Sequence, residues 1–246
     1  TLRKASRHCY LLESASQTEV WGRYSFLGYE PVMEITCTDG YMKIRHTEVG
    51  NDEGVTKQVA HPGDTLREIL KEYKSPVMEE MPPFTGGLVG YFSYDYIKYS
   101  EPKLKLGEHE DPDFRDMDLM LFDQVIAFDH YRQKVLLITG VMLDDLEKSY
   151  QKAEKKLQEM ADLIRDGEKE EFPSLKLASE IKPQFPKEKY CDMVEKAKHY
   201  IHEGDIFQVV LSNPMRAKAE GSLFDTYRVL RATNPSPYMF YFSSDD

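Results

Sequence analysis

Cysteine is scarce in this sequence, with three residues among 246. Cys9, Cys37 and Cys191 are too few and too widely spaced for a disulfide framework, and none has metal-ligand spacing to another cysteine or to a histidine. Few and widely spaced cysteines are typical of proteins in a reducing compartment, so we expect a cytoplasmic protein. The histidines are equally scattered, and His199 and His202 are interpreted as part of a solvated helix surface.

Long hydrophobic runs are also missing. The apolar stretches have the length of strands, and none approaches the roughly 20 residues of a membrane-spanning helix, so we expect no membrane segment. Arg3, Lys4 and Arg7 near the start are followed by no apolar segment of signal-peptide type. Positive charge is outweighed, because 32 Lys and Arg stand against 43 Asp and Glu, a formal net charge of −11. Such a chain repels phosphate backbones, which argues against a nucleic-acid partner.

The apolar patterns that are present predict an α+β protein. Helices are expected over 65–73, 144–165, 187–203 and 222–234, and strands over 9–12, 26–37, 41–46, 88–94, 119–128, 134–141, 206–212 and 238–242. Gly204 is expected to end the helix over 187–203. The charged, proline-containing stretch 166–186 has linker composition. We therefore expect one domain over 1–165, a linker over 166–186 and a second domain over 187–246.

The two ends of the sequence read as the cut edges of a longer protein. The last residues follow directly on the predicted strand 238–242, and a buried strand needs a partner on each side. The predicted strand 206–212 is expected to lack a partner as well. Unpaired strands favour self-association, which leaves homo-oligomers open.

Four short segments stand out as candidate motifs. They are Leu11-Leu12-Glu13-Ser14 with the following Gly22-Arg23-Tyr24-Ser25-Phe26-Leu27-Gly28, the glycine-rich segment 86–95, the segment 204–212, and Asn234-Pro235-Ser236-Pro237-Tyr238-Met239. The glycine-rich segment lacks both the dinucleotide and the phosphate-loop patterns, so close strand packing is the better interpretation. Each of the others, taken alone, reads as an ordinary strand, loop or proline-rich turn.

Gln208 is the unusual residue of the third segment. Strand alternation places it among apolar residues on a strand that is apolar on both faces, which predicts a buried amide. A buried amide needs hydrogen-bond partners, and neighbouring backbone is the plainest source of them.

In combination and in this order, the segments resemble the chorismate-utilising enzymes, and within them the large subunit of anthranilate synthase. The resemblance covers nearly the whole chain. It implies a strand-rich N-terminal regulatory domain, followed by the first part of the α/β sandwich that binds chorismate. The family's later motifs, which include its Mg²⁺-binding glutamates and a catalytic histidine, are missing from the 246 residues. The resemblance therefore implies a front portion that makes no anthranilate on its own.

The reaction implied by the resemblance joins chorismate and ammonia and releases anthranilate and pyruvate, the first step of tryptophan biosynthesis. Mg²⁺ holds the substrate carboxylate in that reaction. A separate glutamine amidotransferase subunit supplies the ammonia. Gln208 is expected to face the chorismate pocket, at a position where relatives that add water carry a lysine.

The resemblance also implies a site for L-tryptophan as feedback inhibitor. Glu13 and Ser14 would meet the ammonium group of the amino acid, while Tyr238 and Met239 would offer flat or polarisable surfaces to the indole. Arg23 would meet an acid, either of the ligand or of the protein. The complete set of expected contacts is Glu13, Ser14, Arg23, Tyr24, Ser25, Asn234, Pro237, Tyr238 and Met239.

Two other functions stay open. The large subunit of aminodeoxychorismate synthase aminates the same substrate at another carbon, although the Pro-Tyr-Met segment and the paired N-terminal motifs favour anthranilate synthase. A protein of a different class, which only binds an amino acid, is the second alternative.

Overall fold

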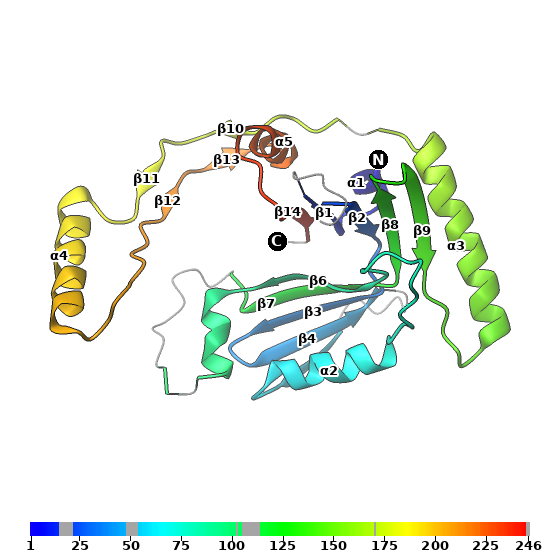
Figure 1. The fold of residues 1–246 in the computed structure, drawn as a ribbon, viewed down its shortest axis with the longest axis horizontal. Coiled ribbons are helices and arrows are strands. Elements are labelled where there is room, and N and C mark those ends of the chain that lie inside the picture. The colour runs from blue at the N-terminus through cyan, green and yellow to red at the C-terminus, as the bar shows by residue number, and fades with distance from the viewer. Residues whose placement is uncertain (15–21, 48–53, 102, 105–113, 170, 245–246) are drawn as a thin grey trace. The chain divides into compact units, whose positions relative to one another are not determined.

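The structure is a computed structural model that describes residues 1–14, 22–47, 54–101, 103–104, 114–169 and 171–244 (Figure 1). It divides into two compact units, which are described separately. Unit 1 comprises Thr1–Glu170 together with Arg231–Asp246, and unit 2 comprises Glu171–Leu230. The C-terminal residues thus lie in the same unit as the N-terminus. The functional domain assignment over 1–165, 166–186 and 187–246 stays a prediction.

The first sheet of unit 1 is antiparallel throughout. Its strand order is β14-β1-β2-β8-β9, with bounds β14 Met239–Ser243, β1 Cys9–Glu13, β2 Tyr24–Tyr29, β8 Gln124–Asp129 and β9 Lys134–Thr139. Helix α1, Leu2–Ala5, and helix α3, Leu146–Asp166, supply apolar residues to one face of this sheet. Met160 of α3 is fully buried there against Cys9, Tyr29 and Ile126.

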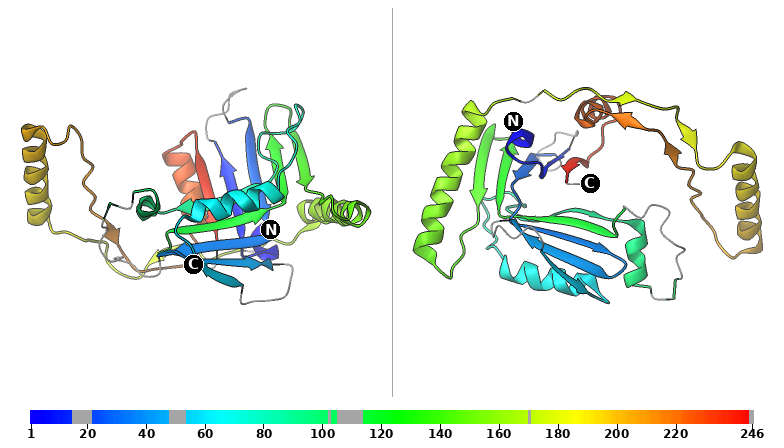
Figure 2. Two further views of the ribbon diagram at one scale, coloured as in Figure 1. Left: turned by 90° about the horizontal axis from the view of Figure 1, so that it is seen from below. Right: turned by 180° about the vertical axis from the view of Figure 1, so that it is seen from behind.

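The second sheet of unit 1 is also antiparallel. Its strand order is β5-β4-β3-β7-β6, with bounds β5 Val55–Gln58, β4 Tyr41–His46, β3 Met33–Thr38, β7 Met117–Phe122 and β6 Gly87–Phe92. Helix α2, Pro62–Glu72, packs Leu66 and Ile69 into the core of this sheet, and the 3-10 helix η2, Tyr94–Tyr99, follows β6. Figure 2 shows α2 lying along the sheet.

Tyr10 joins the two sheets. Its side chain is buried with Val89, Met120 and Phe122 of the second sheet, and its ring lies edge-on to Phe122 at a centroid distance of 4.7 Å. The same ring fills the space beside Gly28, where a Cβ atom would come within 2.2 Å of Tyr10 Cε1. Glycine at position 28 is therefore a requirement of packing.

Two predicted strands are each divided in the structure. The predicted strand 26–37 is β2 and β3, and the predicted strand 119–128 is β7 and β8. The first break falls at Glu30, whose φ is 51°, followed by a proline that has no N–H to donate. The two halves of each predicted strand are buried in different sheets. The apolar pattern therefore continues across the turn between them, and the sequence does not reveal that turn.

The predicted helices are confirmed to within a few residues. Helix α4 spans Lys187–Glu203, and Gly204 ends it in the left-handed conformation at φ 82°. Helix α5 spans Phe224–Thr233. The carboxylate of Asp145 caps α3 by accepting from the backbone N–H of Lys148 at 3.4 Å. No helix in the described part of the chain is long and apolar enough to cross a membrane.

Unit 2 contains helix α4 and short two-residue strands. These strands pair as β10, Lys176–Leu177, with β13, Ala219–Glu220, and as β11, Lys182–Pro183, with β12, Met215–Arg216. The predicted strand 206–212 is wrong, because these residues form no strand and Phe207 is 94% exposed. A strand needs a neighbouring backbone to satisfy its N–H and C=O groups, and this segment pairs with none in the described residues.

The opposite error concerns the predicted strand 238–242. It was expected to lack a partner, and it is instead β14, paired with β1 along its whole length from Glu13↔Met239 to Cys9↔Ser243. The partner strand lies at the other end of the sequence, where local patterns give no information about pairing.

Candidate functional site

The pairing of β1 with β14 brings together the two halves of the predicted tryptophan site. Glu13, the last residue of β1, lies directly opposite Met239, the first residue of β14. On the other side of β1, Leu12 lies opposite Phe26 of β2, so Tyr24 and Ser25 begin β2 at the same end of the sheet. Residues from the paired N-terminal motifs and from the C-terminal motif therefore meet at one end of the first sheet (Figure 1).

Glu13, Ser25 and Met239 share one face of this sheet. Opposed residues of an antiparallel pair point to the same side, which places Glu13 with Met239. Leu11 lies opposite Leu27, and alternation along β1 and β2 carries that face to Glu13 and Ser25. The Ser25 and Met239 residues are 6% and 7% exposed. A carboxylate, a hydroxyl and a thioether thus converge on a largely buried face.

Arg231 contacts this group from helix α5. Its Nε lies 2.9 Å from Oε1 of Glu13, whose side chain is 11% exposed, while the Arg231 side chain is 44% exposed. A half-buried carboxylate is stabilised by such a cation. Nothing in the sequence indicates that Arg231 contacts Glu13, because a basic residue in the last turn of a helix is ordinary.

Arg23 binds an acid of the protein itself. Its Nε and one terminal nitrogen donate to the two oxygens of Asp129 at 3.0 and 2.6 Å. The hydrogen bonds from Arg23 hold the pKa of Asp129 at about 2, below its ordinary value, and the backbone N–H groups of Tyr131 and Arg132 support the same carboxylate. Of the two roles expected for Arg23, the structure therefore contains the internal ion pair.

Tyr24 and Ser25 are held in place by neighbours. The Tyr24 ring stacks on Phe26 at a centroid distance of 5.8 Å, and the Arg23 guanidinium lies 4.8 Å from the centre of the Tyr24 ring. The hydroxyl of Ser25 lies 2.8 Å from Nε2 of His130. These contacts fix the beginning of β2 and position the Ser25 hydroxyl.

The remaining predicted contacts are more open. Ser14 is half-buried directly after β1, whereas Asn234 and Pro237 are exposed, and Tyr238 is 78% exposed before β14. The Tyr238 backbone N–H donates to Ser236 Oγ at 3.4 Å. Tyr238 therefore presents its ring to solvent, while the adjacent Met239 points into the sheet face that carries Glu13.

Gln208 lies in unit 2 and is exposed. The prediction of a buried amide on a strand is wrong, since the segment that carries it is neither a strand nor buried. Its expected place in a chorismate pocket stays a prediction. The described residues also contain no group of three or more His, Cys, Asp or Glu that could hold a metal ion.

Residues 7–246 match the model of a protein family described as chorismate binding enzyme. The chain belongs to this family. Among solved structures, it resembles the crystal structure of anthranilate synthase component I from Streptococcus pneumoniae TIGR4, with a TM-score of 0.70 and 31% identity. That similarity covers 89% of this chain and 47% of the other chain, and it agrees with the α+β fold expected from the sequence.

Curated relatives in two groups are similar to the chain. Anthranilate synthase component 1 of Acinetobacter calcoaceticus is 35% identical over 94% of this chain and 46% of the relative. The protein of the same name from Aquifex aeolicus (strain VF5) is 34% identical over 99% of this chain and 49% of the relative. Aminodeoxychorismate synthase component 1 of Bacillus subtilis (strain 168) is 33% identical over 100% of this chain and 50% of the relative. The chain therefore spans about half the length of the curated relatives that it matches.

Proposed function

We propose that this chain acts within the large subunit of an anthranilate synthase and that it carries the site at which tryptophan inhibits the enzyme. Membership of the chorismate binding enzyme family and the similarity to anthranilate synthase components from several organisms support the reaction. The observation that carries the regulatory part is the register of β1 and β14, which sets Glu13 opposite Met239.

The chemistry at this end of the sheet suits a zwitterionic aromatic amino acid. The carboxylate of Glu13 is the natural partner of an ammonium group, and the hydroxyl of Ser14 follows it directly in the chain. Met239 and Tyr238 provide the polarisable and aromatic surfaces on which an indole packs. Pro235, directly after Asn234, and Pro237 keep the chain extended, which leaves backbone carbonyls available to accept a hydrogen bond from a ligand.

Inhibition assays with the complete enzyme test the regulatory proposal. Ser14→Ala and Met239→Thr are expected to raise the tryptophan concentration that gives half inhibition, while the turnover of chorismate without tryptophan stays unchanged. Met78→Thr is a matched control, because Met78 is 53% exposed outside the proposed site. Unchanged inhibition in both site variants would remove Ser14 and Met239 from the inhibitor site.

Most of the residues that carry out the catalytic step are proposed to lie outside this chain. We propose that Mg²⁺ and most catalytic groups of the reaction are held by residues outside these 246, that Gln208 faces the chorismate pocket of the whole enzyme, and that a glutamine amidotransferase subunit supplies ammonia. The chain alone is then expected to leave chorismate unchanged in the presence of ammonium and Mg²⁺. The sparse, unbridged cysteines support a cytoplasmic location for the whole protein.

Amination of chorismate at the other carbon is a second candidate reaction. It is favoured by one observation, the similarity of the Bacillus subtilis aminodeoxychorismate synthase over the entire chain. Product analysis of the complete enzyme with its amidotransferase separates the two reactions. Anthranilate as the released product supports our proposal, and accumulation of aminodeoxychorismate contradicts it.

A further inference from the structure

Unit 1 contains a polar cavity of about 150 Å³ at the opposite end of β1 from Glu13. His8, directly before β1, and Ser244, directly after β14, line it from the first sheet, and residues of β3, β4 and β7 line it from the second. The charged or ionisable lining groups are His8, Glu34, Lys43, Arg45, Arg115 and Asp118. The cavity is thus distinct from the proposed tryptophan site.

Among the described residues that line this cavity, cations outnumber anions, against the trend of the whole chain. Lys43, Arg45 and Arg115 are permanently positive at neutral pH, and they stand against the two carboxylates Glu34 and Asp118. The chain as a whole has a formal net charge of −11. Three cations at one concave surface of such an acidic chain form a local positive site.

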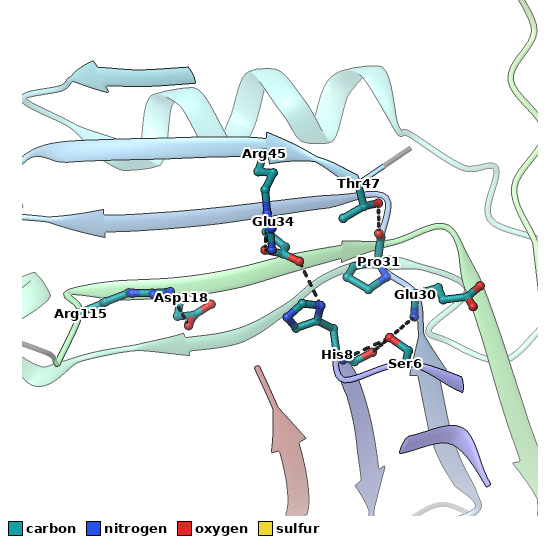
Figure 3. Close-up of polar contacts among 9 residues, drawn as sticks. All are labelled: Ser6, His8, Glu30, Pro31, Glu34, Arg45, Thr47, Arg115 and Asp118. Carbon is teal, nitrogen blue, oxygen red and sulfur yellow. Dashed lines mark hydrogen bonds and ion pairs between the residues drawn. The ribbon is translucent and has the colours of Figure 1, made fainter. Parts of the chain in front are cut away.

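The two carboxylates are less exposed than the arginines that pair with them. The side chains of Asp118 and Glu34 are 3% and 14% exposed, whereas those of Arg115 and Arg45 are 30% and 26% exposed. Arg45 Nε donates to Glu34 Oε2 at 3.0 Å, and Arg115 donates to Asp118 Oδ2 at 3.1 Å (Figure 3). The buried acids therefore hold the guanidinium groups in fixed orientations, and the positive charge lies nearer to solvent.

His8 is positioned by contacts with both sheets. Its Nδ1 lies 3.1 Å from Oε1 of Glu34, and Figure 3 shows the imidazole turned toward that carboxylate. The Ser6 hydroxyl donates to the His8 carbonyl at 2.9 Å and accepts from the His8 backbone N–H at 3.1 Å. The Glu30 N–H, beyond β2, donates to the same hydroxyl at 3.2 Å. The imidazole is thereby fixed at the wall of the cavity.

We propose that this cavity binds a small oxyanion, of the size of inorganic phosphate or a short dicarboxylate. Guanidinium and ammonium groups bind oxyanions through charge-assisted hydrogen bonds, and guanidinium groups held in place by buried acids lose little freedom when they do so. Sites for larger organic ligands have volumes of roughly 300–1,000 Å³, so this cavity suits an anion of few atoms. The proposal does not depend on the proposed enzymatic function.

Titration of the 246-residue chain with inorganic phosphate tests this site. The imidazole resonances of His8 are followed by NMR at constant ionic strength, with chloride as the reference anion and succinate in a parallel series. We expect saturable shifts with phosphate, succinate or both, and whichever series saturates identifies the source of the oxyanion. Shifts that stay linear in both series, as expected for weak non-specific association, or no shifts at all, would overturn the proposal.

Lys43→Gln is the first variant, because Lys43 is exposed on β4 and its loss leaves the buried acids paired with arginine. Removing one charge-assisted contact is expected to weaken binding by about tenfold. Lys134→Gln, at an exposed position of β9, removes the same charge outside the cavity and should leave the affinity unchanged. Equal effects of the two variants, or no effect of Lys43→Gln, would contradict a site in this cavity.

Discussion

Arg231 Nε lies 2.9 Å from Glu13 Oε1, so the carboxylate proposed to receive the ammonium group of tryptophan already has a cationic partner. Two cations that share one carboxylate compete for it. Arg231 is therefore expected to limit the affinity of the site.

Arg231→Gln is expected to strengthen tryptophan binding two- to fivefold, because a partly exposed ion pair contributes about 0.2–1 kcal/mol. Isothermal titration calorimetry measures the change. Arg228→Gln is a matched control on the same helix, since Arg228 pairs with Asp225 at 3.2 Å and is 69% exposed. Weaker binding by the Arg231 variant would show that Arg231 supports the ligand and does not compete with it.

The ion pair between Arg23 and Asp129 predicts a pH dependence of stability. The pKa of Asp129 is about 2 in the folded state, below the ordinary value of 3.8, so the folded state binds this proton more weakly than the unfolded state does. The resulting stabilisation is fully present above pH 4 and is lost as the pH falls through 2. Asp129→Asn should lower the free energy of unfolding at pH 7 by about 1–2 kcal/mol, and it should flatten the dependence on pH between 4 and 2.

Urea unfolding at several pH values measures both effects of Asp129→Asn. Asp162→Asn provides the control, because Asp162 forms an exposed pair with Arg165 on α3 and such pairs contribute little. If the two variants show the same pH dependence, the carboxylate of Asp129 is not the group that titrates.

Tyr99 and Asp116 join η2 to the turn between β3 and β4. The Tyr99 hydroxyl donates to Asp116 Oδ2 at 2.7 Å and accepts from the Gly40 N–H at 2.7 Å, while Lys98 lies 2.8 Å from the other oxygen of Asp116. Burial alone would raise the pKa of Asp116, but hydrogen bonds from Lys98 and Tyr99 outweigh it and hold the pKa below its usual value. The network therefore keeps a fully buried carboxylate charged.

Tyr99→Phe removes the hydroxyl from this network and is expected to cost about 1–3 kcal/mol of stability, because Asp116 and Gly40 each lose a hydrogen bond. The midpoint of thermal unfolding reports the loss. Tyr94→Phe, on the same 3-10 helix, should have no effect, since Tyr94 is 87% exposed. An unchanged midpoint for Tyr99→Phe would mean that the network contributes no net stability.

The sequence predicted local elements better than their pairing. Helix α4 and its end at Gly204 follow from apolar periodicity and a left-handed glycine, which are properties of neighbouring residues. The break at Glu30 was missed because the residues on both sides of the turn are buried. The pairing of Glu13 with Met239 joins strands from opposite ends of the chain, so no periodicity of either segment contains it.

Calorimetric titration of the chain with L-tryptophan tests the central claim most directly. The account predicts saturable binding of one tryptophan per chain, which Met239→Thr and Glu13→Gln weaken and Met78→Thr does not, because the first two residues lie opposite each other in β14 and β1. Absence of tryptophan binding, or binding that neither site variant changes, would contradict the assignment of the inhibitor site to this end of the sheet.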